Sequence, residues 1–158
     1  GEQFAHDIGE TPDSMEVIYD YDGVPLVFTL SPTGIPGFLH LGGIGCMIQG
    51  TKGTVVTNYD THEVYLDNQK VENPDLGNTP ALEPSPGHIR QFLDCIKSRK
   101  QPDCNVFYAH QLAKGLHLGL IAFRTGESLT WDDDKERFVG NNRANRFLKR
   151  RYRRPWKI

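Results

Sequence analysis

The period of the hydrophobic pattern changes once along this chain, near residue 85. Before that point apolar and polar residues alternate over short runs, which predicts β-strands at 15–21, 26–30, 46–49, 54–58 and 63–66. After it, apolar residues recur with the 3.6-residue period of an amphipathic helix. Strands followed by helices predict an α+β fold, with a predominantly antiparallel β-sheet and helices packed on one face.

Turn-forming residues separate the predicted strands. Asp22-Gly23 predicts a hairpin between the first two strands, and the segment 50–53 predicts a second hairpin. Residues 31–43 hold two prolines and several glycines, so we expect a loop there. Residues 67–84 are polar and proline-rich and show no periodicity, which predicts a long connection.

The second half of the chain predicts two longer helices. Ser85 is a suitable N-cap and Pro86 suits the first helical position. The apolar stripe of this first helix is Ile89, Phe92, Leu93 and Ile96.

A second apolar stripe predicts a helix that ends at Gly126. We further expect an edge strand at 128–131 and a short helix at 141–149. The stripe of the second helix is formed by Ala109, Leu112, Ala113, Leu116, Leu120 and Phe123.

Charge is distributed unevenly over the 158 residues. We expect one α+β domain over 1–158, with an irregular lead-in at 1–14 and a basic tail at 143–158 that holds eight basic and no acidic residues. The rest of the chain holds 10 basic and 20 acidic residues. The tail therefore either binds an acidic ligand or docks on the acidic body or on a second copy of it. Because the acidic body is the simpler partner, we do not expect nucleic-acid binding, although the tail mixes cations with aromatic residues.

Several classes of site are excluded by motif. Gly43-Ile44-Gly45 leads into a predicted strand, whereas a dinucleotide fingerprint needs a helix N-terminus there. Residues 45–52 read G-x-x-x-x-G-T-K, in which the last two residues are reversed relative to a phosphate-binding loop. They also fall in a predicted hairpin turn. The six histidines form no HExxH and the chain has no CxxC, so we predict no metal site. No apolar run is long enough to span a membrane.

Three cysteines, Cys46, Cys95 and Cys104, give no disulfide framework, and we expect buried or half-buried free thiols. A polar stripe of His110, Lys114 and His117 lies opposite much of the apolar stripe of the second predicted helix. It has two interpretations. Such a stripe is usually a solvated face, and the alternative is that it lines a substrate cleft or a subunit contact.

Several segments, in order along the chain, resemble the C-terminal domain of the Gfo/Idh/MocA oxidoreductases. The similarity is strongest to the branch abundant in planctomycete-like bacteria. The segments that carry it are Glu10–Val17, Gly50–Thr54, His88–Lys100, His117–Gly126, Phe138–Gly140 and Ala144–Trp156.

The resemblance implies a substrate-binding and oligomerisation domain of an NAD(P)-dependent sugar or polyol oxidoreductase. In the full-length family a Rossmann domain binds NAD or NADP and supplies a lysine in an E-K-P motif, and a histidine follows in D-x-x-x-H. This sequence contains neither motif, so we assign no catalytic, cofactor-binding or metal residue and expect the chain to bind no cofactor and to be inactive alone.

By the same resemblance, the sheet forms a wall of the substrate site and packs against another subunit. We therefore expect a soluble homo-oligomer that binds a sugar-like small molecule, in a bacterial cytoplasm or periplasm. The loop 31–44 with His40 could border that ligand, and the candidate cleft residues are His40, His110, Lys114 and His117. The alternative function is a homodimeric scaffold or binding module without redox chemistry.

Overall fold

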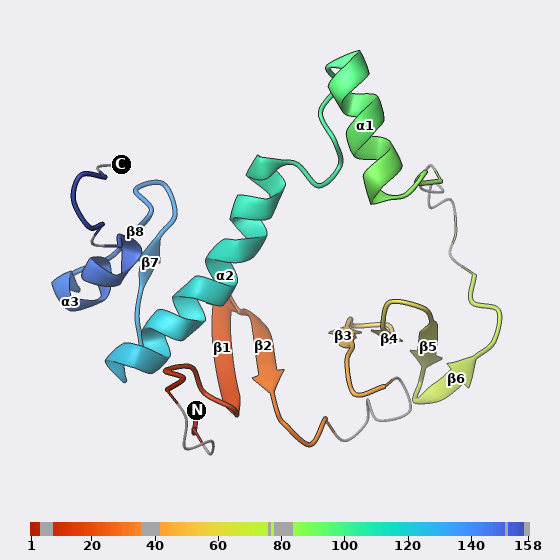
Figure 1. Ribbon diagram of the computed structural model, residues 1–158. Coiled ribbons are helices and arrows are strands. Elements are labelled where there is room, and N and C mark those ends of the chain that lie inside the picture. Colours follow the sequence, from red (N-terminus) through yellow and green to blue (C-terminus); the bar gives the residue numbers. More distant parts are fainter. Residues whose placement is uncertain (4–7, 36–41, 76, 78–83, 151, 157–158) are drawn as a thin grey trace. The chain divides into compact units, whose positions relative to one another are not determined.

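The computed structural model describes residues 1–158 except 4–7, 36–41, 76, 78–83, 151 and 157–158 (Figure 1). The chain divides into two compact units, residues 1–83 and 84–158, which are described in turn. In the first unit the lead-in is held by one isolated bridge, in which the Glu2 amide donates to the Ser14 carbonyl at 2.8 Å.

The first unit contains a two-stranded hairpin, β1 (Met15–Tyr21) with β2 (Val24–Leu30). Asp22 and Gly23 both have positive φ, 52° and 85°, the conformation that a two-residue hairpin turn requires. The Asp20 carboxylate accepts the Gly23 amide at 3.0 Å and closes this turn. The predicted hairpin is thus confirmed, and β2 begins two residues earlier than expected.

The register of the hairpin separates an apolar face from a mixed one. Leu26 and Val27 are adjacent and point to opposite faces, with exposed fractions of 49% and 54%. Val27 pairs with Ile18 on the mixed face, which also carries Glu16. The other face is aliphatic and aromatic throughout, with Met15, Val17, Tyr19, Tyr21, Val24, Leu26, Phe28 and Leu30.

A four-stranded antiparallel meander completes the first unit. It consists of β3 (Cys46–Gln49), β4 (Thr54–Thr57), β5 (His62–Leu66) and β6 (Gln69–Val71), in that order. The register aligns one apolar residue from each strand across the sheet, namely Ile48, Val55, Val64 and Val71.

Strand β6 lies where the sequence predicted only a long connection, so that prediction is wrong for residues 69–71. Asp67 and Asn68 have φ of 48° and 59° and form a tight turn that returns the chain against β5. Lys70 then donates to Glu63 at 3.1 Å, and the Tyr65 hydroxyl donates to the same carboxylate at 2.8 Å. These hydrogen bonds raise the pKa of Tyr65 and of Lys70, because Glu63 favours the protonated form of each. Backbone pairing and this polar cluster hold β6, which explains why no hydrophobic period marks it.

The second unit begins with helix α1 (His88–Ser98). The predicted N-cap Ser85 and first helical residue Pro86 are wrong, because Gly87 takes the cap position with φ 89°. The Ser85 hydroxyl accepts the Gly87 amide at 3.2 Å and forms a turn before the helix instead. The predicted apolar stripe is on this helix, but its four side chains are exposed.

Helix α2 (Val106–Thr125) is bounded by clear caps. The Asn105 side chain accepts the amides of Phe107 and Tyr108 at 3.0 and 3.1 Å. Gly126, with φ 68°, ends the helix in the left-handed conformation and donates to Ala122 at 2.9 Å. The predicted helix end is confirmed.

A short hairpin and a small core follow α2. β7 (Trp131–Asp132) pairs with β8 (Arg137–Phe138), so the edge strand expected at 128–131 begins only at Trp131. Trp131 and Phe138 meet edge to face with ring centroids 5.1 Å apart. The buried residues here are Ile121, Phe138 and Ala144, with Leu118, Leu129 and Trp131 packed against them.

The chain then forms α3 (Asn142–Asn145) and a 3₁₀ turn, η2 (Arg146–Leu148), as the predicted short helix. Asn145 is bonded twice to Phe138, accepting its amide at 2.8 Å and donating to its carbonyl at 2.9 Å. This amide therefore replaces a β-ladder partner and holds α3 on β8.

Over the residues that the structure describes, antiparallel sheets together with three α-helices confirm the α+β class, although the strands there form three sheets rather than one. Within the described part of the chain, no helix is long and apolar enough to cross a membrane. All three cysteines are free. Cys95 is half-buried as expected, but Cys46, on an outer strand, and Cys104, between α1 and α2, are exposed, so the prediction of buried thiols is wrong for these two.

Candidate functional site

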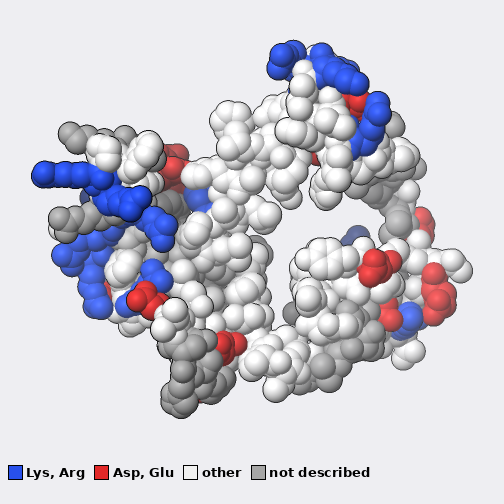
Figure 2. Space-filling view, in the orientation of Figure 1, with Lys and Arg blue, Asp and Glu red and all other residues white. Residues whose placement is uncertain are grey.

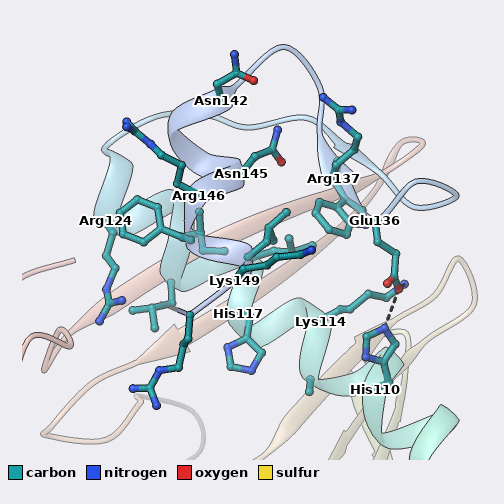
Figure 3. A pocket seen from close by; sticks show the side chains of 18 residues that line it. His110, Lys114, His117, Arg124, Glu136, Arg137, Asn142, Asn145, Arg146 and Lys149 are labelled. Atoms are coloured by element: carbon teal, nitrogen blue, oxygen red, sulfur yellow. Dashed lines mark hydrogen bonds and ion pairs between the residues drawn. The ribbon is translucent and has the colours of Figure 1, made fainter. Parts of the chain in front are cut away.

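The second unit contains an open cleft of roughly 1370 Å³. Its 18 lining residues come from α2, from the β7–β8 hairpin and from residues 142–150 (Figure 3). Each segment supplies both apolar and charged side chains. The cleft lies entirely within residues 110–150 and therefore within one compact unit.

Helix geometry places Lys114 of the polar stripe on the packed side of α2, whereas His110 and His117 are exposed. Ile121 is buried, and Lys114 precedes Ile121 by seven residues on the same side of the helix. His117 precedes Ile121 by one turn. The Lys114 side chain is only 13% exposed. By contrast Leu112 and Leu116, from the stripe expected to pack, are exposed. The expectation that α2 packs through that stripe is wrong for these two leucines, because the hairpin and α3 cover a different side of the helix.

Two carboxylates of the β7–β8 hairpin bind His110 and Lys114 of the polar stripe. His110 Nε2 lies 2.7 Å from Glu136 Oε1, and Lys114 Nζ lies 3.7 Å from the same oxygen (Figure 3). Lys114 also pairs directly with Asp133. Asp133 in turn accepts the Trp131 indole N–H at 3.0 Å. His110 and Lys114 are thus joined to the hairpin by one connected polar network.

This network favours the charged forms of Asp133, Glu136 and Lys114. The hydrogen bond from Lys114, aided by that from Trp131, lowers the pKa of Asp133. Hydrogen bonding to His110 lowers the pKa of Glu136, and the bond to Asp133 raises the pKa of Lys114. Because the folded carboxylates have depressed pKa values, their stabilising effect is present above the ordinary carboxyl pKa and is lost as pH falls through the lowered values.

Positive charge dominates the remainder of the lining. Glu136 is the one acidic residue among the lining residues described, against six lysines and arginines. In Figure 2, Lys and Arg side chains (blue) gather over the C-terminal elements. In the part of the chain that the structure describes, no carboxylate forms an ion pair with Arg146, Lys149 or Arg150. The six cations are Lys114, Arg124, Arg137, Arg146, Lys149 and Arg150.

Apolar and aromatic groups line the cleft beside these charges. Trp131 is fixed by its indole bond to Asp133 and by its contact with Phe138. The amide of Asn145 is occupied by the Phe138 backbone, so it serves the scaffold. The other apolar lining residues include Leu118, Ile121, Phe147 and Leu148.

The structure brings three of the four predicted candidates together. His110, Lys114 and His117 all line the cleft, whereas His40 lies outside the described residues. Sequence reasoning missed Glu136 and Arg137, because the hairpin returns them to α2 from a point 26 residues beyond His110. The basic tail was the available signal for Arg146, but nothing in the sequence showed that Arg146 lines the same cleft as His117.

Among the described residues, no group of three His, Cys, Asp or Glu side chains could hold a metal ion. Gly43 and Gly45 precede strand β3 and not a helix, as the sequence predicted. Lys52 lies in the turn between β3 and β4, again without a helix N-terminus for a phosphate.

Fold and site together define an α+β protein with an open cleft in its second unit. Residues 45–158 match the family described as the oxidoreductase family, C-terminal alpha/beta domain. The chain belongs to the Gfo/Idh/MocA oxidoreductase family, and the matched region is its C-terminal domain. The match begins just before β3, so the β1–β2 hairpin precedes it. A search of curated proteins and a search of solved structures each found no significant match.

Proposed function

We propose that this chain is the substrate-binding domain of an NAD(P)-dependent oxidoreductase that acts on a sugar or polyol. The observation that carries the proposal is the cleft on α2, within the region that matches the family. A concave site with an aromatic and aliphatic lining and a few converging polar groups is typical of small-molecule binding. His117 and Lys114 would face the hydroxyl groups of the ligand, and Trp131 its carbon face.

The nicotinamide cofactor would be held outside this domain. NAD(P) supplies a hydride acceptor when bound, but the residues described here do not fit it, since neither glycine-rich segment leads into a helix. At roughly 1370 Å³ the cleft exceeds the ordinary range of about 300–1,000 Å³ for small ligands, which leaves room for groups from another domain. We therefore assign ligand binding to this chain, and no step of hydride transfer.

Two titrations test the proposal. The purified chain is titrated with a panel of sugars and polyols while NMR follows the indole N–H signals of Trp131 and Trp156. We expect at least one ligand to shift Trp131, and His117→Ala to weaken that ligand about tenfold. His62→Ala, on β5 in the other unit, is the matched control and should leave binding unchanged. In a parallel fluorescence titration NADH should show no saturable micromolar binding.

Three results would contradict this function. No panel member shifts Trp131, or His62→Ala weakens binding as much as His117→Ala, or NADH binds saturably at micromolar concentration. The last result would mean that a dinucleotide site exists in this chain.

We further propose that the apolar face of the β1–β2 hairpin is a contact with a second copy of the chain. A two-stranded hairpin is marginally stable alone, and this one carries eight aliphatic or aromatic side chains on a face that remains partly exposed. A second copy offers the same surface, so the contact would be isologous. This surface also supports the alternative of a homodimeric scaffold without redox chemistry.

Leu26→Lys should shift the chain toward monomer in sedimentation velocity, because it places a charge in that contact. Val27→Lys is the control: it is adjacent and similarly exposed, but it lies on the mixed face and should leave the distribution unchanged. Equal effects of the two variants, or a wild-type chain that is monomeric throughout the micromolar range, would rule out this interface.

A further inference from the structure

We propose that the cleft on α2 recognises an anionic ligand, a polyhydroxylated small molecule that carries a carboxylate or phosphate group. This deepens the proposed function, on which it rests, by naming the chemical class of the substrate. The family match says nothing of ligand charge, and the inference comes from the cations that line the cleft.

The lining of the cleft carries more positive than negative charge. The acidic groups near the cleft already form ion pairs, because Glu136 binds His110 and Lys114 and Asp133 binds Lys114. Arg146, Lys149 and Arg150 have no carboxylate partner in the described part of the chain. A concave surface with several cations and one carboxylate concentrates anions, because low-dielectric walls focus the field.

The cations of the cleft come from two segments of the chain. Lys114 lies on α2, and Arg146 and Lys149 lie on the C-terminal segment, so both segments contribute positive charge to the same cleft (Figure 3). An arginine can bind a carboxylate or phosphate through two parallel hydrogen bonds, which fixes the orientation of the ligand. Cations spread over a convex surface would not provide this.

The lining of the cleft suits a small molecule better than an acidic polymer. Beside the cations lie the ring of Trp131 and the side chains of Leu118 and Ile121, which a phosphate backbone does not need. The imidazole of His117 has no hydrogen-bond partner among the described residues, so it remains available to a hydroxyl group. Anionic, polar and apolar recognition in one cleft suits a sugar acid or a sugar phosphate.

Isothermal titration of the full chain compares glucose, gluconate, glucose 6-phosphate, inorganic phosphate, NADP⁺ and a single-stranded oligonucleotide. We expect gluconate or glucose 6-phosphate to bind at least about tenfold more tightly than glucose, because a charge-assisted hydrogen bond outweighs a neutral one. The affinity for the anionic sugar should fall as the salt concentration rises. Binding of that sugar should also shift the Trp131 indole signal.

A pair of matched double variants tests the location. Arg146→Gln with Lys149→Gln removes two charges from the cleft and should weaken the anionic sugar at least about tenfold while leaving glucose unchanged. Lys97→Gln with Lys100→Gln removes the same charge from α1 and the segment after it, and should change neither. Circular dichroism of both variants checks that each is folded.

The remaining outcomes separate the two proposals. If glucose binds as tightly as its anionic relatives and shifts Trp131, the proposed function stands and the anionic class is wrong. If inorganic phosphate binds as tightly as glucose 6-phosphate, the cleft recognises an isolated anion, and the inference fails. Tighter binding of NADP⁺ would assign the phosphate contact to the cofactor, and tighter binding of the oligonucleotide would assign the cations to nucleic acid; both overturn the inference. If no ligand binds, both proposals fail.

Discussion

Replacing Phe138 with alanine should lower the free energy of unfolding of the second unit by about 3–5 kcal/mol. Phe138 is 1% exposed and is the one large side chain fully buried in the described residues. Its ring contacts Trp131, and its backbone is bonded to Asn145 on α3. Truncation would therefore leave a cavity at the point where α2, the hairpin and α3 meet.

Chemical denaturation followed by circular dichroism measures this loss. Phe107→Ala on α2 is the matched control, since that phenylalanine is 73% exposed and its loss should change stability by about 0.5 kcal/mol or less. The Trp131 indole signal should lose its dispersion in Phe138→Ala alone, because the aromatic contact is gone. Equal stability of the two variants would show that this small core does not hold the unit together.

Gly53→Ala should destabilise the four-stranded sheet by about 1–3 kcal/mol. A Cβ at residue 53 would collide with the Tyr65 carbonyl oxygen and would lie 2.7 Å from Leu66 Cδ2. The leucine could rotate away, but the carbonyl belongs to the backbone of β5 and cannot move without disturbing the β4–β5 ladder. Glycine is therefore required at this position by the close approach of two backbone segments, residue 53 and strand β5.

Gly50→Ala provides a control in the same turn, because its Cβ would meet only the Gly53 carbonyl at an ordinary 3.5 Å. Hydrogen exchange at Val55 and Val64, which face each other in β4 and β5, should accelerate in Gly53→Ala and not in Gly50→Ala. Equal protection in both variants would show that the turn relaxes and that the close approach is not needed.

Local structure was predictable wherever the signal itself is local. The Asp22-Gly23 turn and the end of α2 at Gly126 depend on backbone conformations that few residues adopt, so they could be located from sequence. The same reasoning failed at the start of α1, where Ser85 makes a turn rather than a cap. Ser85 and Gly87 are both plausible capping residues, and only the backbone φ of Gly87 distinguishes between them.

The cleft was predictable only in part. The spacing of His110, Lys114 and His117 is sufficient to place them on one side of a helix. The spacing does not say which elements cover that side of α2. The apolar stripe that includes Leu112 predicted that a different side of α2 is packed. Glu136 and Arg146 enter from segments whose approach depends on the β7–β8 hairpin and on α3.

The amino-acid sequence by itself determined the order of strands and helices, the ends of several elements and the family resemblance, because periodicity, turn chemistry and motifs act over a few residues. Tertiary structure decided which side of α2 is packed, that β6 joins the sheet, and that a basic C-terminal segment shares a cleft with Lys114. These outcomes depend on contacts between residues far apart in the chain. The entropy of bringing such residues together is offset only by the burial and pairing of the folded state.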